Sequence, residues 1–307
     1  FKKYAIADVL VGSVSSALDS IDASTPGSII VYGIFLYAIY QYADFSGGID
    51  MVRGVSQLFG IKMAENFRQP YFSISIADFW HRWHITLGAW MRDYVFYPMA
   101  LRPSMKALTA WATTHISKHV GRTIAGCLAN IVVFFLVGLW HGAEMPYIFW
   151  GLYNGLLIAS ADLARPLFTW LIEKLKINVE SAPYHVFRIV RTFILVCIGY
   201  YFDRLMHADD LPIAFYNTLF NFQSANFVPY LQLHPTANFT LCILLAAVSC
   251  LILFAVSVMS ERGVDVKGRI LAAPLVVRFL VYAVFVALIL FSFTLVQSSG
   301  GFMYANF

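Results

Sequence analysis

Long apolar runs separated by short polar segments dominate the chain. Six of these runs approach the length of a membrane-spanning helix, which needs about 20 largely apolar residues. They cover residues 28–43, 122–140, 145–163, 185–202, 237–259 and 273–296. The pattern predicts an all-α fold, a polytopic transmembrane helical bundle.

The stretch 45–120 departs from this pattern, because charged residues, prolines and aromatic residues recur in it at close intervals. It is too polar to cross lipid simply and too apolar for an ordinary loop. Irregular backbone at membrane depth persists only where it is buried in protein or lines a wet cavity. We therefore expect short re-entrant or interfacial helices in this stretch.

Composition supports a membrane protein. Hydrophobic residues make up 60% of the 307 residues and charged residues 12%, whereas soluble domains have about 45–50% and 25%. So few charges cannot cover a water-exposed surface of this size. The net charge of +4, with no basic tract and no phosphate-binding glycine loop, excludes nucleic acid as a partner and favours the lipid bilayer.

The charges of the polar segments predict an orientation in the membrane. Basic residues gather in 164–184, in 260–272 and at Lys118 and Arg122, whereas 203–236 carries aspartates and a single arginine. The positive-inside rule places the basic segments in the cytoplasm and 203–236 outside. The chain reversal that follows residue 140 then lies at the outer side or beneath it.

A titratable side chain stands at that reversal, in the sequence FLVGLWHGAEMP (135–146). Gly138 and Gly142 flank His141, so we expect a break between two closely packed spans. An ionisable group in a membrane segment is a functional candidate, and an imidazole is suited to accept a proton near neutral pH. The alternative is an interfacial histidine bonded to a nearby carbonyl group, and the sequence leaves both interpretations open.

A second set of candidates lies in DFWHRWHITLGAWMRDYVFYP (78–98). If this segment is one helix, His81 and His84 share a face, and Trp80 and Trp83 share the neighbouring face. So many hydrogen-bonding groups among aromatic rings favour a lined pocket. An amphipathic helix at the headgroup level is the alternative.

Other motifs are weaker. His115 and His119 have metal-ligand spacing, but the glutamate of a zinc-protease motif is absent, so we expect no metal site. The four cysteines lie in apolar runs and predict no disulfide. The segment 44–50 follows a predicted span and is interpreted as turn and capping chemistry; Asn66 is interpreted as a cap or part of a cavity wall.

No motif of a protein nucleophile is present. An enzyme built on these residues would use His141 as the base and a substrate hydroxyl as the nucleophile that attacks an activated acyl carbon. His84 would orient the substrate, share in proton transfer or stabilise the developing oxyanion.

Four blocks in order resemble the membrane-bound O-acyltransferase (MBOAT) family, specifically its bacterial branch of alginate O-acetyltransferases and D-alanyl transfer proteins. The blocks are DFSGGIDM (44–51), NFRQPYFSISIADFWHRWHITLGAWMRDYVFYP (66–98), GLWHGA (138–143) and WGLYNG (150–155). Three positions depart from the family pattern. His81 stands where arginine is usual, Gly48 where tyrosine is usual, and Asn154 where histidine is common.

The resemblance implies acyl transfer to a hydroxyl group in a helical bundle with a central cavity. It makes His141 and His84 the catalytic residues. We expect six further residues to bind substrate: Trp80, Arg82, Trp83, Asp93, Trp140 and Asn154.

The resemblance also implies the domain organisation. We expect a single membrane domain over 1–307, with a motif-bearing core at 44–155 and three C-terminal spans in 185–296. Members of the family have more spans than this chain shows, so we expect N-terminal spans to be missing.

The implied reaction transfers an acyl group, with acetyl favoured over D-alanyl, from a thioester donor to hydroxyls of an envelope polysaccharide, peptidoglycan or teichoic acid. Acetyl-CoA or an acyl carrier protein would be the donor substrate, and no bound cofactor is expected. Expected partners are the envelope polymer, a membrane-anchored or extracytoplasmic acyltransferase and a carrier protein. The expected location is the bacterial cytoplasmic membrane.

Two other classes remain as alternatives. A proton-coupled transporter or flippase-like bundle would use buried histidines and aspartates along a substrate path, but it predicts two related halves, and no internal repeat is visible. A membrane metalloenzyme would need a carboxylate or cysteine that completes a histidine ligand set.

Overall fold

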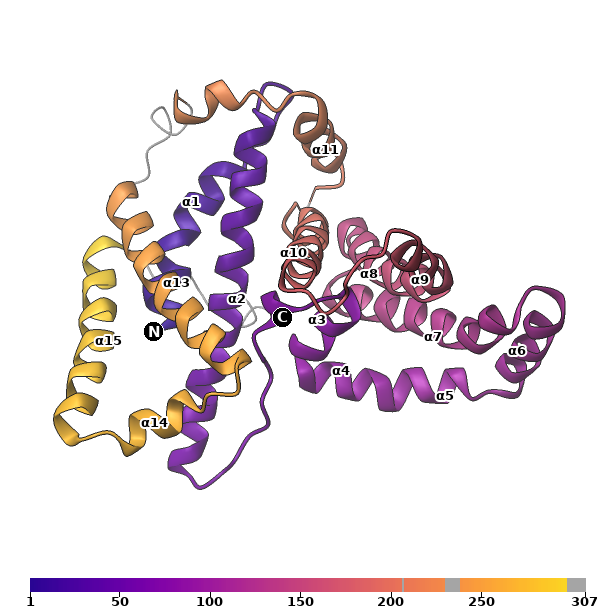
Figure 1. The fold of residues 1–307 in the computed structure, drawn as a ribbon. Coiled ribbons are helices and arrows are strands. Elements are labelled where there is room, and N and C mark those ends of the chain that lie inside the picture. Colours follow the sequence, from indigo (N-terminus) through magenta and orange to yellow (C-terminus); the bar gives the residue numbers. More distant parts are fainter. Residues whose placement is uncertain (206, 230–237, 297–307) are drawn as a thin grey trace. The chain divides into compact units, whose positions relative to one another are not determined.

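The computed structural model describes residues 1–205, 207–229 and 238–296, and these are mostly helical (Figure 1). The predicted all-α class is confirmed. The described residues form no sheet, and their one isolated backbone bridge joins Phe67 to Trp83. The predicted outer segment 203–236 and the span 237–259 fall partly outside the described residues.

The chain forms two compact units. The first contains Phe1–Met63 and the described residues from Asp209 onward, and the second contains Ala64–Ala208. Three of the four sequence blocks therefore lie in the second unit, and the block 44–51 lies in the first.

The first unit consists of helices from both ends of the chain. They are η1 (Lys3–Ala7), α1 (Asp8–Leu18), α2 (Gly27–Leu58), α11 (Asp210–Phe220), η4 (Ser224–Asn226), α13 (Phe239–Glu261), α14 (Val266–Ala272) and α15 (Leu275–Leu295). The second unit consists of η2 (Pro70–Phe72), α3 (Ile76–Arg82), α4 (Ile85–Met91), η3 (Arg92–Phe96), α5 (Tyr97–Ala100), α6 (Pro103–His115), α7 (Lys118–His141), α8 (Met145–Leu163), α9 (Arg165–Lys174) and α10 (Ala182–Arg204).

Five described helices are long and apolar enough to cross a membrane: α2, α7, α10, α13 and α15. The pair α8 and α9, bent by 56° at Ala164, gives a sixth candidate if it counts as one broken span. Each of the six predicted apolar runs thus overlaps one of these helices, as far as its residues are described. The chain is a multi-pass membrane protein by the length and composition of its helices.

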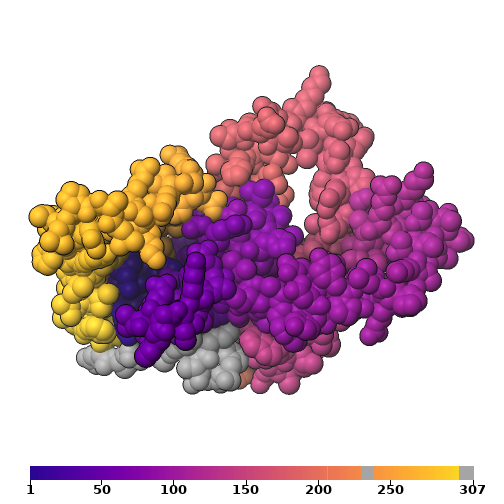
Figure 2. Space-filling model, turned by 90° about the horizontal axis from the view of Figure 1, so that it is seen from below, coloured from indigo at the N-terminus to yellow at the C-terminus, as the bar shows by residue number. Residues whose placement is uncertain are grey.

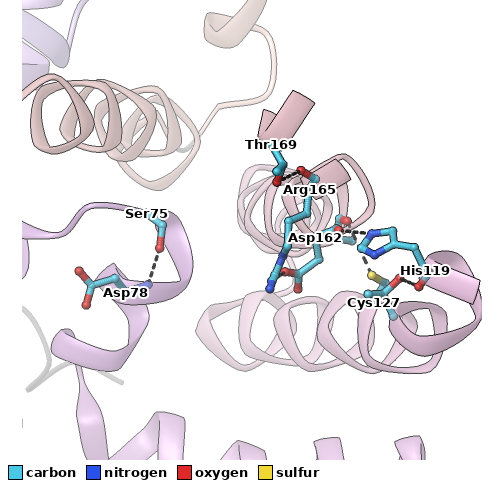
Figure 3. A network of polar contacts seen from close by, with 9 residues as sticks. Ser75, Asp78, His119, Cys127, Asp162, Arg165 and Thr169 are labelled. Carbon is cyan, nitrogen blue, oxygen red and sulfur yellow. Dashed lines mark hydrogen bonds and ion pairs between the residues drawn. The ribbon is translucent and has the colours of Figure 1, made fainter. Parts of the chain in front are cut away.

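Helix starts in the second unit follow simple local rules. Five α-helices, α5, α6, α8, α9 and α10, carry a proline in their first turn, where the missing backbone N–H would have no helical partner. Two others begin at serine caps. The Ser75 hydroxyl accepts from the backbone N–H of Asp78 (Figure 3), and Ser117 accepts from that of Val120.

Helix α2 is longer than predicted. The prediction that 44–50 forms turns after a span is wrong, because these residues continue the helix to Leu58. Gly47 serves close packing instead, since a Cβ there would lie 2.8 Å from the backbone nitrogen of Lys3. The glycine lets η1 approach α2 with its backbone.

A buried ionic cluster joins these two elements. The Lys3 ammonium lies 2.5 Å from Asp44 Oδ1 and 2.9 Å from Asp8 Oδ1, and all three residues are buried. The helices α13 and α15 pack against the same N-terminal elements, as the orange and yellow surfaces beside the indigo one in Figure 2 show. Charged groups buried among helices need such partners.

The short helices predicted within 45–120 are present from α3 to α6. Helices α5 and α6 and the π-helix η3 pack along α7. A Cβ at Gly121 of α7 would overlap Thr113 of α6, so these two helices are in close contact. The depth of this segment in a membrane stays a prediction.

Candidate active site around His84 and His141

The helices α7 and α8 form a tight antiparallel hairpin whose tip carries His141. The imidazole belongs to the last residue of α7, and only residues 142–144 separate α7 from α8. A Cβ at Gly138 would collide with the carbonyl oxygen of Tyr147. The predicted break between two closely packed spans is therefore confirmed.

Aromatic rings surround the imidazole of His141. Trp140 and Trp150 meet it edge-on, with centroids 4.9 and 5.3 Å away, and the ring of Tyr147 stacks on it at 6.0 Å. Trp150 is buried, whereas Trp140 is 53% exposed. Rings thus cover several sides of a half-buried imidazole at the hairpin tip.

A tryptophan from α3 reaches the same hairpin. The Trp80 indole N–H donates to Asn154 Oδ1 over 3.2 Å, and the Asn154 amide donates to the carbonyl of Trp150 over 2.9 Å. The rings of Trp80 and Trp150 also meet edge-on at 5.5 Å. These contacts tie α3 to α8 beside His141, and any role of Trp80 and Asn154 in substrate binding stays a prediction.

His84 does not lie on the helix that the sequence predicts. Helix α3 ends at Arg82, Trp83 is extended, and His84 has a positive φ of 46° before α4 begins. The prediction that His81 and His84 share one helical face is therefore wrong. His81 is an exposed residue of α3.

Backbone pairing with an upstream segment explains the break. The Arg68 N–H donates to the carbonyl of Arg82 (2.9 Å), and the Ile85 N–H donates to the carbonyl of Asn66 (3.0 Å). A continuous helix would need those same backbone groups for its own hydrogen bonds. This pairing interrupts the helix at His84.

Asn66 completes the connection with its side chain. Its Oδ1 accepts from the Thr86 backbone N–H at 3.1 Å, from the Thr86 hydroxyl at 3.0 Å and from His84 Nδ1 at 3.2 Å. The capping role predicted for Asn66 is thus confirmed, although the cap serves a helix 20 residues downstream. Its contact with His84, in contrast, was not predicted from the sequence.

The two histidines belong to one site. His84 lies close enough to His141 for the two imidazoles to interact electrostatically. Burial lowers the pKa of His84 from its usual 6.5 to about 4. His84 is therefore neutral at physiological pH.

Trp83 supports the site through the packing of its buried ring. It is buried and packs against the rings of Phe67 and Phe79, with centroids 5.0 and 5.5 Å away. Tyr71 extends this cluster, and its hydroxyl lies 3.0 Å from that of Tyr200 on α10. Trp83 thus anchors the backbone next to His84 in a core of rings.

Arg82 and Asp93, both predicted to bind substrate, have protein partners. Arg82 Nε donates to Asp78 Oδ1 over 2.9 Å within α3. Asp93 is exposed on η3 and accepts from the neighbouring Arg92 over 2.9 Å. None of the described contacts of Asp93 reaches either histidine, and substrate binding by both residues stays a prediction.

The second histidine pair does not form a helical metal-binding face. His115 ends α6 and stacks on Trp111, whereas His119 belongs to α7. His119 Nε2 donates to the carbonyl of Asp162 over 2.9 Å, and the Asp162 carboxylate pairs with Arg165 (Figure 3). Within the ranges that the structure describes, no group of three or more potential metal-ligating side chains is present.

No family model matches the chain. A probable alginate O-acetylase of Pseudomonas syringae pv. tomato is 32% identical over 225 residues, which are 72% of this chain and 37% of that protein. The teichoic acid D-alanyltransferase of Bacillus subtilis is 34% identical over 54% of this chain and 38% of its own length. The peptidoglycan O-acetyltransferase of Helicobacter pylori is 35% identical over 40% of this chain and 20% of its own length.

The fold and the site define a multi-pass helical membrane protein in which His84 lies near His141, and aromatic rings surround His141 at a hairpin tip. With the similarities above, the chain is similar to bacterial acyltransferases of the membrane-bound O-acyltransferase type. The chain spans less than half the length of the curated relatives that it matches. The comparisons give no support to the transporter alternative.

Proposed function

We propose that the protein containing this chain transfers an acyl group from a thioester to hydroxyls of a cell-envelope polymer. Acetyl is the favoured group and D-alanyl the second choice; the acceptor is a polysaccharide, peptidoglycan or teichoic acid. The observation that carries the proposal is that His84 lies near His141, whose imidazole is surrounded by aromatic rings at the hairpin tip. The names of the relatives supply the reaction class.

The chemistry needs no protein nucleophile. His141 accepts the proton of the acceptor hydroxyl while its oxygen attacks the thioester carbonyl carbon. The new carbon–oxygen bond forms, the carbon–sulfur bond breaks, and the thiolate leaves and takes up the proton. The surrounding rings limit competing water, which would otherwise hydrolyse the donor.

The donor and the partners follow from the same proposal. Acetyl-CoA or an acylated carrier protein would deliver the thioester from the cytoplasm, with no cofactor bound permanently. An acyltransferase anchored in the membrane or outside it would complete the transfer to the polymer. The location would be the bacterial cytoplasmic membrane.

The test is complementation of cells that lack the full-length protein. The wild type, His141→Ala and His141→Gln are compared at matched membrane levels, with His115→Ala as the control for loss of an exposed histidine. We expect both His141 variants to lose acylation of the envelope polymer by about 100-fold or more, the scale of general base catalysis, and His115→Ala to keep it. Wild-type acylation in the His141 variants would show that this residue is not the base.

A further inference from the structure

The contacts of Asn66 determine which atom of its amide faces His84. The Thr86 backbone N–H lies 3.1 Å from the atom assigned as Asn66 Oδ1. A backbone N–H can only donate, so this atom must be the amide oxygen and not the amide nitrogen. In the flipped orientation, the amide NH2 of Asn66 would face the backbone N–H of Thr86, and neither group could accept a hydrogen bond.

The same oxygen then fixes the proton on His84. Asn66 Oδ1 lies 3.2 Å from His84 Nδ1 and has no hydrogen to donate. Nδ1 must therefore carry the proton of the neutral imidazole. A neutral imidazole has one N–H, so Nε2 holds the lone pair.

We propose that Asn66 is a positioning residue that holds His84 as the Nδ1–H tautomer and makes Nε2 a hydrogen-bond acceptor for the substrate hydroxyl. The proposal rests on the acyl transfer proposed above. Of the three roles that the sequence left open for His84, it excludes stabilisation of the oxyanion, because an acceptor nitrogen has no hydrogen to donate, and it favours orientation of the substrate hydroxyl.

Rigid support accompanies the tautomer. Asn66 is only 6% exposed, and its backbone carbonyl accepts from Ile85 while its side chain accepts from Thr86. These bonds hold residues 84–86 and the positive φ of His84 in place. The low pKa of about 4 keeps the imidazole neutral at pH 7, so the tautomer and not an imidazolium meets the substrate.

The tautomer is read directly from nitrogen-15 NMR of the full-length protein labelled at histidine. His84→Gln identifies the resonances, since those of His84 disappear. We expect Nε2 of the wild type to have the shift of an unprotonated ring nitrogen and Nδ1 that of a protonated one. The reverse assignment in the wild type would overturn the proposal.

Three variants test the part played by Asn66. Asn66→Leu removes the oxygen at similar volume, and we expect the Nδ1–H form to give way to a tautomer mixture. Thr86→Val removes only a hydroxyl that shares the oxygen, so the tautomer should stay. Asn66→Asp keeps an acceptor oxygen and adds a charge, so the tautomer should stay and the titration midpoint of His84 should move up from about 4.

Kinetics separate this proposal from the proposed function. We expect Asn66→Leu to lower acyl transfer about tenfold or more, mainly through KM for the acceptor, and Asn66→Asp to restore binding at high pH. A changed tautomer in Asn66→Leu with an unchanged rate of acyl transfer would overturn the hydroxyl-binding role of Nε2.

Absence of acyl transfer in the wild type, with the expected NMR signature, would overturn the proposed function and leave the tautomer assignment standing. If Asn66→Leu does not fold, a His84 midpoint that is unmoved in Asn66→Asp overturns the role of Asn66.

Discussion

The imidazole of His84 is kept neutral by its burial, and this makes the protein sensitive to acid. In the unfolded chain the pKa is near 6.5, whereas in the folded protein it is about 4. The unfolded state therefore binds more protons between these values, and stability falls as the pH decreases from 6.5 to 4.

The size of this loss of stability follows from the lowered pKa of His84. About 2.5 pKa units correspond to about 3 kcal/mol of unfolding free energy, lost between pH 6.5 and 4. In detergent, the free energy of unfolding of the full-length wild type should decrease between pH 6.5 and 4. In His84→Gln this decrease should be smaller by about 3 kcal/mol. Identical pH dependence in both proteins would contradict the burial of a neutral imidazole.

The Lys3 cluster leads to a second prediction for single residues. Lys3→Met leaves two buried carboxylates without their ammonium, and we expect a loss of about 3–5 kcal/mol. Lys2→Met is the matched control, because Lys2 pairs with the exposed Asp50 at 2.7 Å and such pairs contribute at most about 1 kcal/mol. Denaturant unfolding measures both, and equal losses would show that burial does not distinguish the two lysines.

The hairpin of α7 and α8 depends on close backbone contact at one glycine. In Gly138→Ala the new Cβ would meet the carbonyl oxygen of Tyr147, so the helices must separate at the tip and the rings around His141 must shift. Gly126→Ala on the same helix meets only the ring of Phe96 at 3.8 Å, an ordinary contact. We expect the Tm to fall by several degrees for Gly138→Ala and to be unchanged or slightly raised for Gly126→Ala.

Some elements follow from local sequence and others do not. Helix α8 begins at Met145 and ends at Leu163, as its apolar run predicts. The break at His84 has no local signal, because neither glycine nor proline stands there and the interruption comes from pairing with residues 66–68. The long α2 was missed because Gly47, a residue type that normally indicates a turn, packs against the backbone of Lys3 instead.

At the scale of the whole chain, the division into two units was not predictable from the motifs. The block 44–51 lies in one unit and the blocks from residue 66 onward lie in the other. Motif order in sequence indicates a shared family but not which helices pack together. The proximity of His84 and His141, in contrast, was predictable, because both histidines lie in the sequence blocks that carry the family resemblance.

Membrane orientation can be tested with the hairpin. His119 donates a hydrogen bond to the carbonyl of Asp162 (Figure 3). The start of α7 and the end of α8 therefore lie at the same end of the hairpin, and His141, the last residue of α7, lies at the other. Single cysteines at Lys118 and Arg165 should therefore be protected from an impermeant maleimide in intact cells, and a cysteine at Ala143 should react from outside. Labelling of Lys118→Cys and Arg165→Cys from outside, with Ala143→Cys protected, would reverse the predicted orientation.

The short link between α7 and α8 also bears on how the protein is made. Residues 142–144 carry a single carboxylate, that of Glu144, so little charge has to move through the lipid when the tip is translocated. The contacts of the pair are local in sequence, and local contacts form early. We therefore expect α7 and α8 to leave the translocon together once Leu163 has emerged from the ribosome, with His141 carried across the bilayer on a prefolded pair of helices.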